Sequence, residues 1–278
     1  MPERETPQAS SGGLQQAAVH QLRLFFVALQ FFTRLPVPRW VGFQTEWLQH
    51  AARYFPLVGW LVAWISAAVY VAATQFWPQP VAVLLSTAAG IYLTGAFHED
   101  GFADVCDGLG GGMSTARALD IMRDSRIGAY GAIGIGVLLL VKLAALNALL
   151  PFQILAALGI AHPLSRCLAA ALIWRLDYVR EEGKVKPLAQ QMSGKEFFIA
   201  LLTALLPIAG VIALGMMSWQ RVLLGVLLAL LAAYWLARKF VRRLGGYTGD
   251  CLGAVQQLSE VAFYLGALAA VPAFLQFA

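Results

Sequence analysis

The sequence is poor in charge. Only 13% of its 278 residues are Asp, Glu, Lys or Arg, whereas 59% are hydrophobic and the mean hydropathy is +0.68. Soluble domains contain roughly 25% charged residues, because a soluble surface needs charge to stay dispersed in water. The scarcity excludes a soluble enzyme and a disordered chain. A basic nucleic-acid binder is excluded too, since a net charge of +5 in a membrane protein is typical of cytosolic loops beside anionic lipid.

Cysteine is also scarce, with three residues in no paired spacing: Cys106, Cys167 and Cys251. This set provides neither a disulfide framework nor a CxxC metal knuckle. A cleavable signal is missing as well, because the first apolar run begins near Leu22 and ends at Arg34 without a small-residue cleavage site. We expect residues 1–13 to form a flexible tail and residues 14–278 to form a single polytopic membrane domain.

Long apolar stretches are abundant. A bilayer core needs about 20 apolar residues per helix, and spanning segments must be helical because lipid offers no partner for free backbone groups. Seven stretches come close to this length: 54–77, 80–97, 129–150, 152–174, 197–217, 219–237 and 254–276. An eighth, 14–33, either spans the membrane or lies on it as an interfacial helix. The expected fold is an all-α integral membrane protein with about seven transmembrane helices plus an N-terminal amphipathic or membrane helix.

The connections between these stretches alternate between short and long. Four long loops, 34–53, 98–128, 175–196 and 238–253, contain three, three, five and four Lys or Arg residues, while the three tight turns between the other stretches contain none. By the positive-inside rule, all four long loops are cytosolic. We therefore expect the functional residues on the cytosolic face.

One of these loops, 98–128, holds six of the fifteen acidic residues. These are Glu99, Asp100, Asp104, Asp107, Asp120 and Asp124. The first three aspartates are spaced i, i+4, i+7 and would line one stripe of a helix. The last two repeat the i, i+4 spacing on a second short helix that Ser114 would cap. Three glycines at 110–112 would let the chain reverse, giving a cytosolic acidic helical hairpin that brings the carboxylates together.

Converging carboxylates at a membrane surface predict a Mg²⁺ site. Mg²⁺ takes carboxylate oxygens together with substrate phosphates, and a pair of ions would clamp the attacking and leaving oxygens of a phosphoryl displacement. We expect all six acidic residues of loop 98–128 to be candidate ligands. The alternative is a solvated acidic face, but the segment has few Lys partners.

A cationic half of the site is also expected. Arg123 and Arg126 lie beside the second acidic pair, and Arg matches phosphate oxygens with two parallel donors. Further substrate contacts are expected from Arg53, His98, Arg166, Tyr247, Thr248 and Asp250. Two alternatives stay open: Arg166 instead snorkels or pairs with Glu260, which is also in an apolar segment, and the glycine-containing turn before Asp250 is an ordinary helix connector.

Five segments together resemble one enzyme family. They are 32–38 (FTRLPVP), 53–59 (RYFPLVG), 98–108 (HEDGFADVCDG), 121–128 (IMRDSRIG) and 246–251 (GYTGDC). Their order and spacing, over about residues 25 to 265, are similar to those of the cobalamin-5′-phosphate synthase family, whose members are adenosylcobinamide-GDP ribazoletransferases. Glu99 and Asp120 depart from the pattern, which commonly has an apolar residue and Glu at these positions.

The resemblance implies a late step of cobalamin biosynthesis in the bacterial cytoplasmic membrane. The family transfers the adenosylcobinamide-phosphate group from adenosylcobinamide-GDP to α-ribazole 5′-phosphate (or α-ribazole), uses Mg²⁺ and releases GMP. In this sequence Asp100, Asp104, Asp107 and Asp124 would hold the metal. Asp124 would also take the proton of the attacking hydroxyl, with Arg123 or Arg126 neutralising the leaving GMP.

Two other classes compete with this interpretation. A CDP-alcohol-type membrane phosphotransferase needs the pattern D-G-x2-A-R, whereas glycines follow Asp107-Gly108 and the Ala-Arg pair comes too late. A transporter usually has its ionisable residues near the bilayer midplane, whereas the carboxylates here gather in one cytosolic loop. The oligomeric state stays open, with a homo-oligomer or a complex with other cobalamin-assembly enzymes as alternatives.

Overall fold

The computed structural model describes residues 11–180 and 192–269, and within these ranges the chain is built from helices without a named strand. The helices are α1 (Ser11–Phe32), α2 (Thr45–Ala51), α3 (Phe55–Ala73), α4 (Gln79–Thr94), α5 (Phe97–Gly111), α6 (Thr115–Ile121), α7 (Ala129–Asn147), α8 (Pro151–Arg175), α9 (Gly194–Ala213), α10 (Trp219–Leu244) and α11 (Gly249–Leu268). Short 3-10 turns at Arg39–Val41 and Ala52–Tyr54 flank α2. The predicted all-α class is confirmed.

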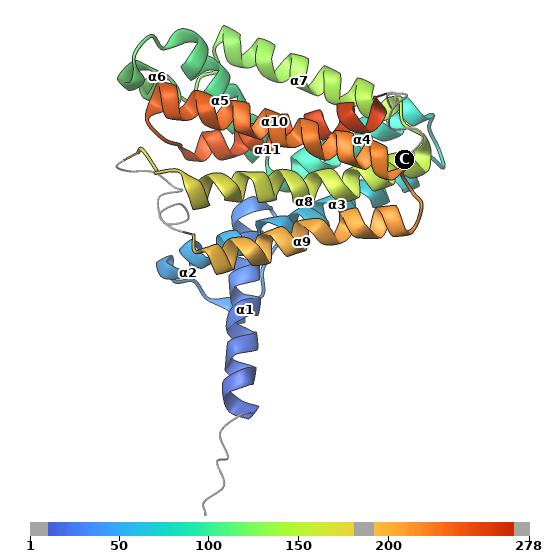
Figure 1. Ribbon diagram of the computed structural model, residues 1–278, viewed down its shortest axis with the longest axis horizontal. Helices are drawn as coiled ribbons and strands as arrows, with labels where there is room; N and C mark the ends of the chain where they lie inside the picture. Colours follow the sequence, from blue (N-terminus) through green and yellow to red (C-terminus); the bar gives the residue numbers. More distant parts are fainter. Residues whose placement is uncertain (1–10, 181–191, 270–278) are drawn as a thin grey trace, which may run out of the picture.

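The long helices run alongside one another as a bundle, with α8 and α11 inside it (Figure 1). Over its most apolar 18-residue stretch, α8 is 83% buried inside the protein. The corresponding stretches of α7, α9 and α10 are only 22–28% buried. The exposed faces of these outer helices are rich in Leu, Ile, Val and aromatic side chains. Such a surface fits contact with lipid, so the fold is that of a multi-pass membrane protein.

Fewer helices than expected are long and apolar enough to cross a bilayer. Among the described residues five qualify: Thr45–Ala73, Ala129–Asn147, Pro151–Arg175, Gly194–Ala213 and Trp219–Leu244, with a sixth if α4 and α5 form one bent span. The predicted count of seven is not confirmed. The predicted span 254–276 corresponds to α11, whose polar residues face other helices rather than lipid.

The predicted span 80–97 is interrupted because the chain turns by 87° between α4 and α5. Two consecutive residues make this turn, Gly95 with φ of 66° and Ala96 with φ of 58°. Glycine adopts this left-handed conformation readily, but Ala96 has a Cβ that crowds the following carbonyl. The bend directs α5, which carries the acidic stripe, toward α11.

Helix α1 crosses the direction of the bundle and extends away from it (Figure 1). Its second half is anchored by buried side chains, among them Leu24, Val27 and Phe32. It is not among the helices that qualify as spans. These features favour the interfacial alternative for residues 14–33. The expected tail at 1–13 lies mostly outside the described residues.

Successive long helices alternate in direction, so their connections gather at two opposite ends. The tight turns 74–78, 148–150 and 214–218 lie at one end. The other end, called the loop end below, carries the connections 33–54, 95–128, 176–193 in its described part, and 245–248. This confirms the predicted alternation of short and long connections, and it gathers the long loops on one side of the bundle.

Ala96→Val should destabilise the protein strongly, because a β-branched side chain fits a left-handed residue poorly. Ala96→Gly should be neutral or stabilising by about 1 kcal/mol, since it removes the strain. The midpoints of thermal unfolding in detergent measure both effects. Ala88→Val, at an exposed position of α4 with ordinary helical backbone, is the matched control. Equal losses in Ala96→Val and Ala88→Val would contradict the strain at Ala96.

Candidate functional site

The candidate site forms where α5 crosses the first turn of α11. A Cβ added to Gly101 would lie 3.0 Å from the Cα and the carbonyl oxygen of Asp250. The two helices therefore touch backbone to backbone, which only a residue without a side chain allows. This crossing brings the acidic stripe of α5 beside Asp250, a residue about 150 positions further along the chain.

Asp100 and Asp104 from α5 lie near enough to Asp250 from α11 for their charges to interact, and the three residues are called the acidic cluster below. Partial burial, together with the negative charges of Asp250 and Asp100, raises the pKa of Asp104 to about 7. Burial also raises the pKa of Asp250. Carboxylates that repel one another at the edge of an apolar bundle favour binding of a cation.

Arg180 closes one side of the acidic cluster. Its Nη2 donates to Asp250 Oδ2 at 2.6 Å and to the carbonyl oxygen of Met122 at 3.3 Å. Backbone pairing holds it there, because Val179 N donates to Tyr247 O at 3.0 Å and Tyr247 N donates to Asp177 O at 2.9 Å. No sequence pattern marks Arg180, because nothing distinguishes it from four other Lys and Arg residues in loop 175–196.

The turn before α11 positions Asp250. Thr248 caps the helix, with its Oγ1 accepting from Cys251 N at 3.4 Å. Tyr247 is fully buried and packs edge to face against Tyr178 with ring centroids 5.6 Å apart. Of the three residues expected here to contact substrate, Asp250 belongs to the acidic cluster, Thr248 holds the helix start and Tyr247 packs into the core.

Asp107, the third aspartate of the predicted stripe, is bonded to the start of α7. Its Oδ2 accepts from Gly128 N at 2.7 Å and its Oδ1 accepts from Gly131 N at 2.8 Å. Backbone donors at a helix N-terminus stabilise a carboxylate in this position. Asp107 therefore anchors α7 to α5, and its oxygens are less free for a metal than those of Asp100 and Asp104.

The second acidic pair does not share a helix. Ser114 caps α6 as predicted, accepting from Arg117 N at 3.3 Å, but α6 ends at Ile121 and Asp124 lies beyond it. The predicted helical i, i+4 pairing with Asp120 is therefore wrong. Asp124 forms an ion pair with Arg126 at 2.6 Å, which lowers the pKa of Asp124 to about 2.

Other predicted residues of α6 and of the α6–α7 connection are exposed to solvent. Asp120, Arg123 and Arg126 are all exposed at the loop end. The acidic stripe of α5 thus meets Asp250 of α11 rather than the carboxylates of a hairpin partner. The exposed arginines remain within the same face of the protein as the acidic cluster.

Arg53 takes part in a separate polar contact at the loop end. It forms an ion pair with Glu196 at the start of α9 and donates to the carbonyl oxygen of His50 at 2.9 Å. The His50 ring nitrogen also lies 2.7 Å from Glu196. The role of Arg53 in substrate binding remains a prediction. The observed contacts of Arg53 connect α9 with the turn before α3.

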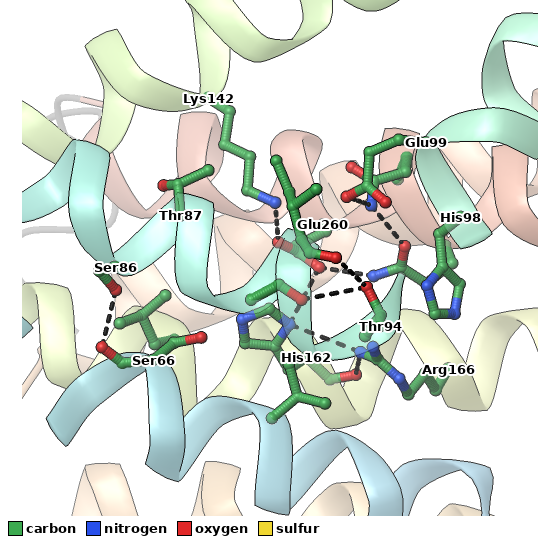
Figure 2. A pocket seen from close by; sticks show the side chains of 16 residues that line it. Ser66, Ser86, Thr87, Thr94, His98, Glu99, Lys142, His162, Arg166 and Glu260 are labelled. Carbon is green, nitrogen blue, oxygen red and sulfur yellow. Dashed lines mark hydrogen bonds and ion pairs between the residues drawn. The ribbon is translucent and has the colours of Figure 1, made fainter. Parts of the chain in front are cut away.

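A second group of ionisable residues lies inside the bundle, called the buried polar cluster below. Figure 2 shows Lys142 and His162 pointing at Glu260, at 2.5 and 3.2 Å, with Arg166 beside them. Arg166 donates to the carbonyl oxygen of His162 at 3.0 Å. The sequence left open whether Arg166 pairs with Glu260. In the structure, Lys142 and His162 pair with Glu260 instead. These contacts pair the charges that the apolar bundle surrounds.

His98 and Glu99 point into the buried polar cluster rather than toward the acidic cluster (Figure 2). Glu99 accepts from Gln257 Nε2 at 2.8 Å, and both residues are buried. The His98 ring stacks on Phe32 with centroids 5.5 Å apart. The first two residues of α5 therefore face inward while Asp100 and Asp104 lie toward the protein surface.

The acidic cluster suits a metal ion that a ligand helps to hold. Among residues 11–180 and 192–269, no three His, Cys, Asp or Glu side chains converge into a ready-made metal site. Mg²⁺ usually takes only one or two carboxylates and completes its shell with water and substrate phosphates. Asp100, Asp104 and Asp250 are hard oxygen donors of this kind.

Comparison with known proteins identifies relatives over most of the chain. The family model described as cobalamin-5-phosphate synthase matches residues 24–268. An adenosylcobinamide-GDP ribazoletransferase from Leptothrix cholodnii is 50% identical over 260 residues, covering 92% of this chain and 98% of the relative. Proteins with the same name from Ralstonia pickettii and Vibrio cholerae are 46% and 44% identical, covering 88% and 90% of this chain and 94% and 95% of those relatives.

No solved structure matches the chain. The family model covers α2 to α11 and the part of α1 from Leu24 onward, and so includes the acidic cluster, Arg180 and the buried polar cluster. The chain belongs to the cobalamin-5-phosphate synthase family.

Proposed function

We propose that the protein is a membrane-embedded adenosylcobinamide-GDP ribazoletransferase. It transfers the adenosylcobinamide-phosphate group from adenosylcobinamide-GDP to α-ribazole 5′-phosphate or α-ribazole, and it releases GMP. The names of its relatives support the reaction. The meeting of Asp100, Asp104 and Asp250 at the α5–α11 crossing is the structural observation that carries the proposal.

The reaction is an in-line displacement at phosphorus. A ribose hydroxyl of the ribazole attacks the phosphorus that carries the aminopropanol arm of the corrinoid, and the new P–O bond forms as the P–O bond to GMP breaks. Such transition states are loose, so catalysis consists mainly of positioning and charge stabilisation. The protein must therefore hold two anionic substrates in line and neutralise the charge on the departing phosphate.

The acidic cluster is the proposed Mg²⁺ site, in which one or two of its carboxylates would ligate the ion. Mg²⁺ bound there would neutralise the diphosphate and stabilise the leaving group. Arg180 fixes Asp250 in place through its 2.6 Å contact. The exposed side chain of Arg123 is available to the phosphate oxygens, since Arg matches such oxygens with two donors. Arg126 is exposed as well, but its Nε and Nη2 donate to Asp124.

Asp124 is poorly suited to accept the hydroxyl proton. Its contact with Arg126 lowers its pKa to about 2, far below the neutral pH at which a general base works best. A loose transition state leaves the proton on the attacking oxygen until late, so a strong base is not required. Asp124 instead holds Arg126 in the exposed loop beside the site.

Asp104→Asn should lower turnover by at least about 100-fold, because it removes a charge from the acidic cluster. Release of GMP is measured with purified protein, adenosylcobinamide-GDP, α-ribazole 5′-phosphate and Mg²⁺. EDTA should abolish activity of the unmodified protein, and added Mg²⁺ should restore it. Glu46→Gln, on the exposed face of α2, is the control for loss of a carboxylate. Near-normal activity of a folded Asp104→Asn protein would refute the role of the acidic cluster.

The loop end should face the cytosol, because it carries the Lys- and Arg-rich connections. In a variant without its three native cysteines, Ser125→Cys at the loop end should react with an impermeant maleimide in inverted vesicles only. Gln75→Cys, in the tight turn after α3, should react in intact spheroplasts. The opposite labelling pattern would place the acidic cluster on the periplasmic face and contradict the proposed cytosolic orientation of the site.

A further inference from the structure

An open groove lies between α8 and α10, away from the acidic cluster. Its volume is about 570 Å³, within the range of sites that hold small organic ligands. Its floor is apolar, with Leu172 from α8 and Leu230, Ala233 and Ala237 from α10. Only 28% of the most apolar stretch of α10 is buried inside the bundle. The groove therefore opens on the surface that the membrane covers.

Three arginines line the groove at the loop end. Arg175 is the last residue of α8, and Arg238 and Arg242 are one turn apart near the end of α10. All three are exposed, and within the described residues none of them forms an ion pair with a carboxylate. Arg238 donates to a neutral partner, the hydroxyl of Tyr234, at 3.2 Å. The groove thus has three positive charges at one end without a described counter-ion.

The charged and apolar parts are arranged in sequence along α10. Eight residues separate Arg238 from Leu230, which corresponds to roughly 12 Å along a helix. An anion held by the arginines could therefore extend an apolar chain along the floor of the groove. A small soluble anion would leave this floor uncovered, and an uncharged lipid would leave the arginines without a partner.

We propose that the groove binds one anionic phospholipid from the leaflet at the loop end. Its phosphate lies among Arg175, Arg238 and Arg242, and one acyl chain follows the floor toward Leu230. Basic residues at the ends of membrane helices attract anionic headgroups, each contributing about 1 kcal/mol. The proposal is independent of the transfer reaction, because none of these residues belongs to the acidic cluster or the buried polar cluster.

Lipid retention on purified protein tests the proposal. The protein is exchanged into detergent with equal amounts of dioleoyl phosphatidylglycerol and dioleoyl phosphatidylcholine, and bound lipid is counted by native mass spectrometry. Phosphatidylglycerol should be retained preferentially at one molecule per chain. The Arg238→Gln/Arg242→Gln variant should bind it about 30-fold more weakly, as expected for two arginine contacts. The Arg39→Gln/Arg117→Gln variant loses two exposed charges elsewhere and should keep normal affinity.

A second variant separates lipid from free phosphate. Ala233→Trp fills the apolar floor but keeps all three arginines, so it should lose the lipid if the acyl chain lies in the groove. Inorganic phosphate at millimolar concentration should not displace the lipid. The proposal would be overturned by equal retention of the two lipids or by displacement of the lipid by phosphate. It would also be overturned by unchanged lipid binding in folded Arg238→Gln/Arg242→Gln and Ala233→Trp proteins, or by a dimer of this chain that excludes lipid.

Discussion

The structure depends on pairing a carboxylate that lies inside an apolar bundle. Glu260 on α11 is fully buried, and a charge there is tolerated only when partners compensate it. Lys142 on α7 and His162 on α8 supply that compensation, so one side chain fixes the relative positions of three helices. Gln257, one turn earlier on α11, then donates to Glu99 of α5. The acidic cluster is assembled next to these contacts, because Glu99 directly precedes Asp100.

The sequence predicted those features of the structure that depend on residues close together in the chain. The spacing of Asp100, Asp104 and Asp107 predicted the helix that the structure contains, and Ser114 caps α6 as expected. The alternation of basic loops and tight turns predicted the two ends of the bundle. The 87° bend before α5 could not be predicted, because it requires a left-handed Ala96, which no sequence pattern marks. That bend determines where the acidic stripe points.

Contacts between distant segments account for the remaining differences. Asp250 meets α5 through a backbone crossing at Gly101, and Arg180 reaches Asp250 from a third segment. Neither contact leaves a periodic signal in the sequence. The predicted span 254–276 is not confirmed within the described part of α11, and its residues 270–276 lie outside the described residues. A helix enclosed by other helices can carry Gln256, Gln257 and Glu260 where a lipid-facing helix cannot. The ligand roles predicted for the acidic residues remain predictions.

The position of α11 in the chain affects how the protein folds while it is being translated. Hairpins such as α3–α4 and α7–α8, joined by tight turns, can enter the membrane while translation is still under way. The acidic cluster includes Asp250, and the compensation of Lys142 needs Glu260, yet both residues leave the ribosome well after α7. Until then Lys142 has no counter-charge in the bilayer. We therefore expect α7 and α8 to reach their final packing only after α11 docks against them.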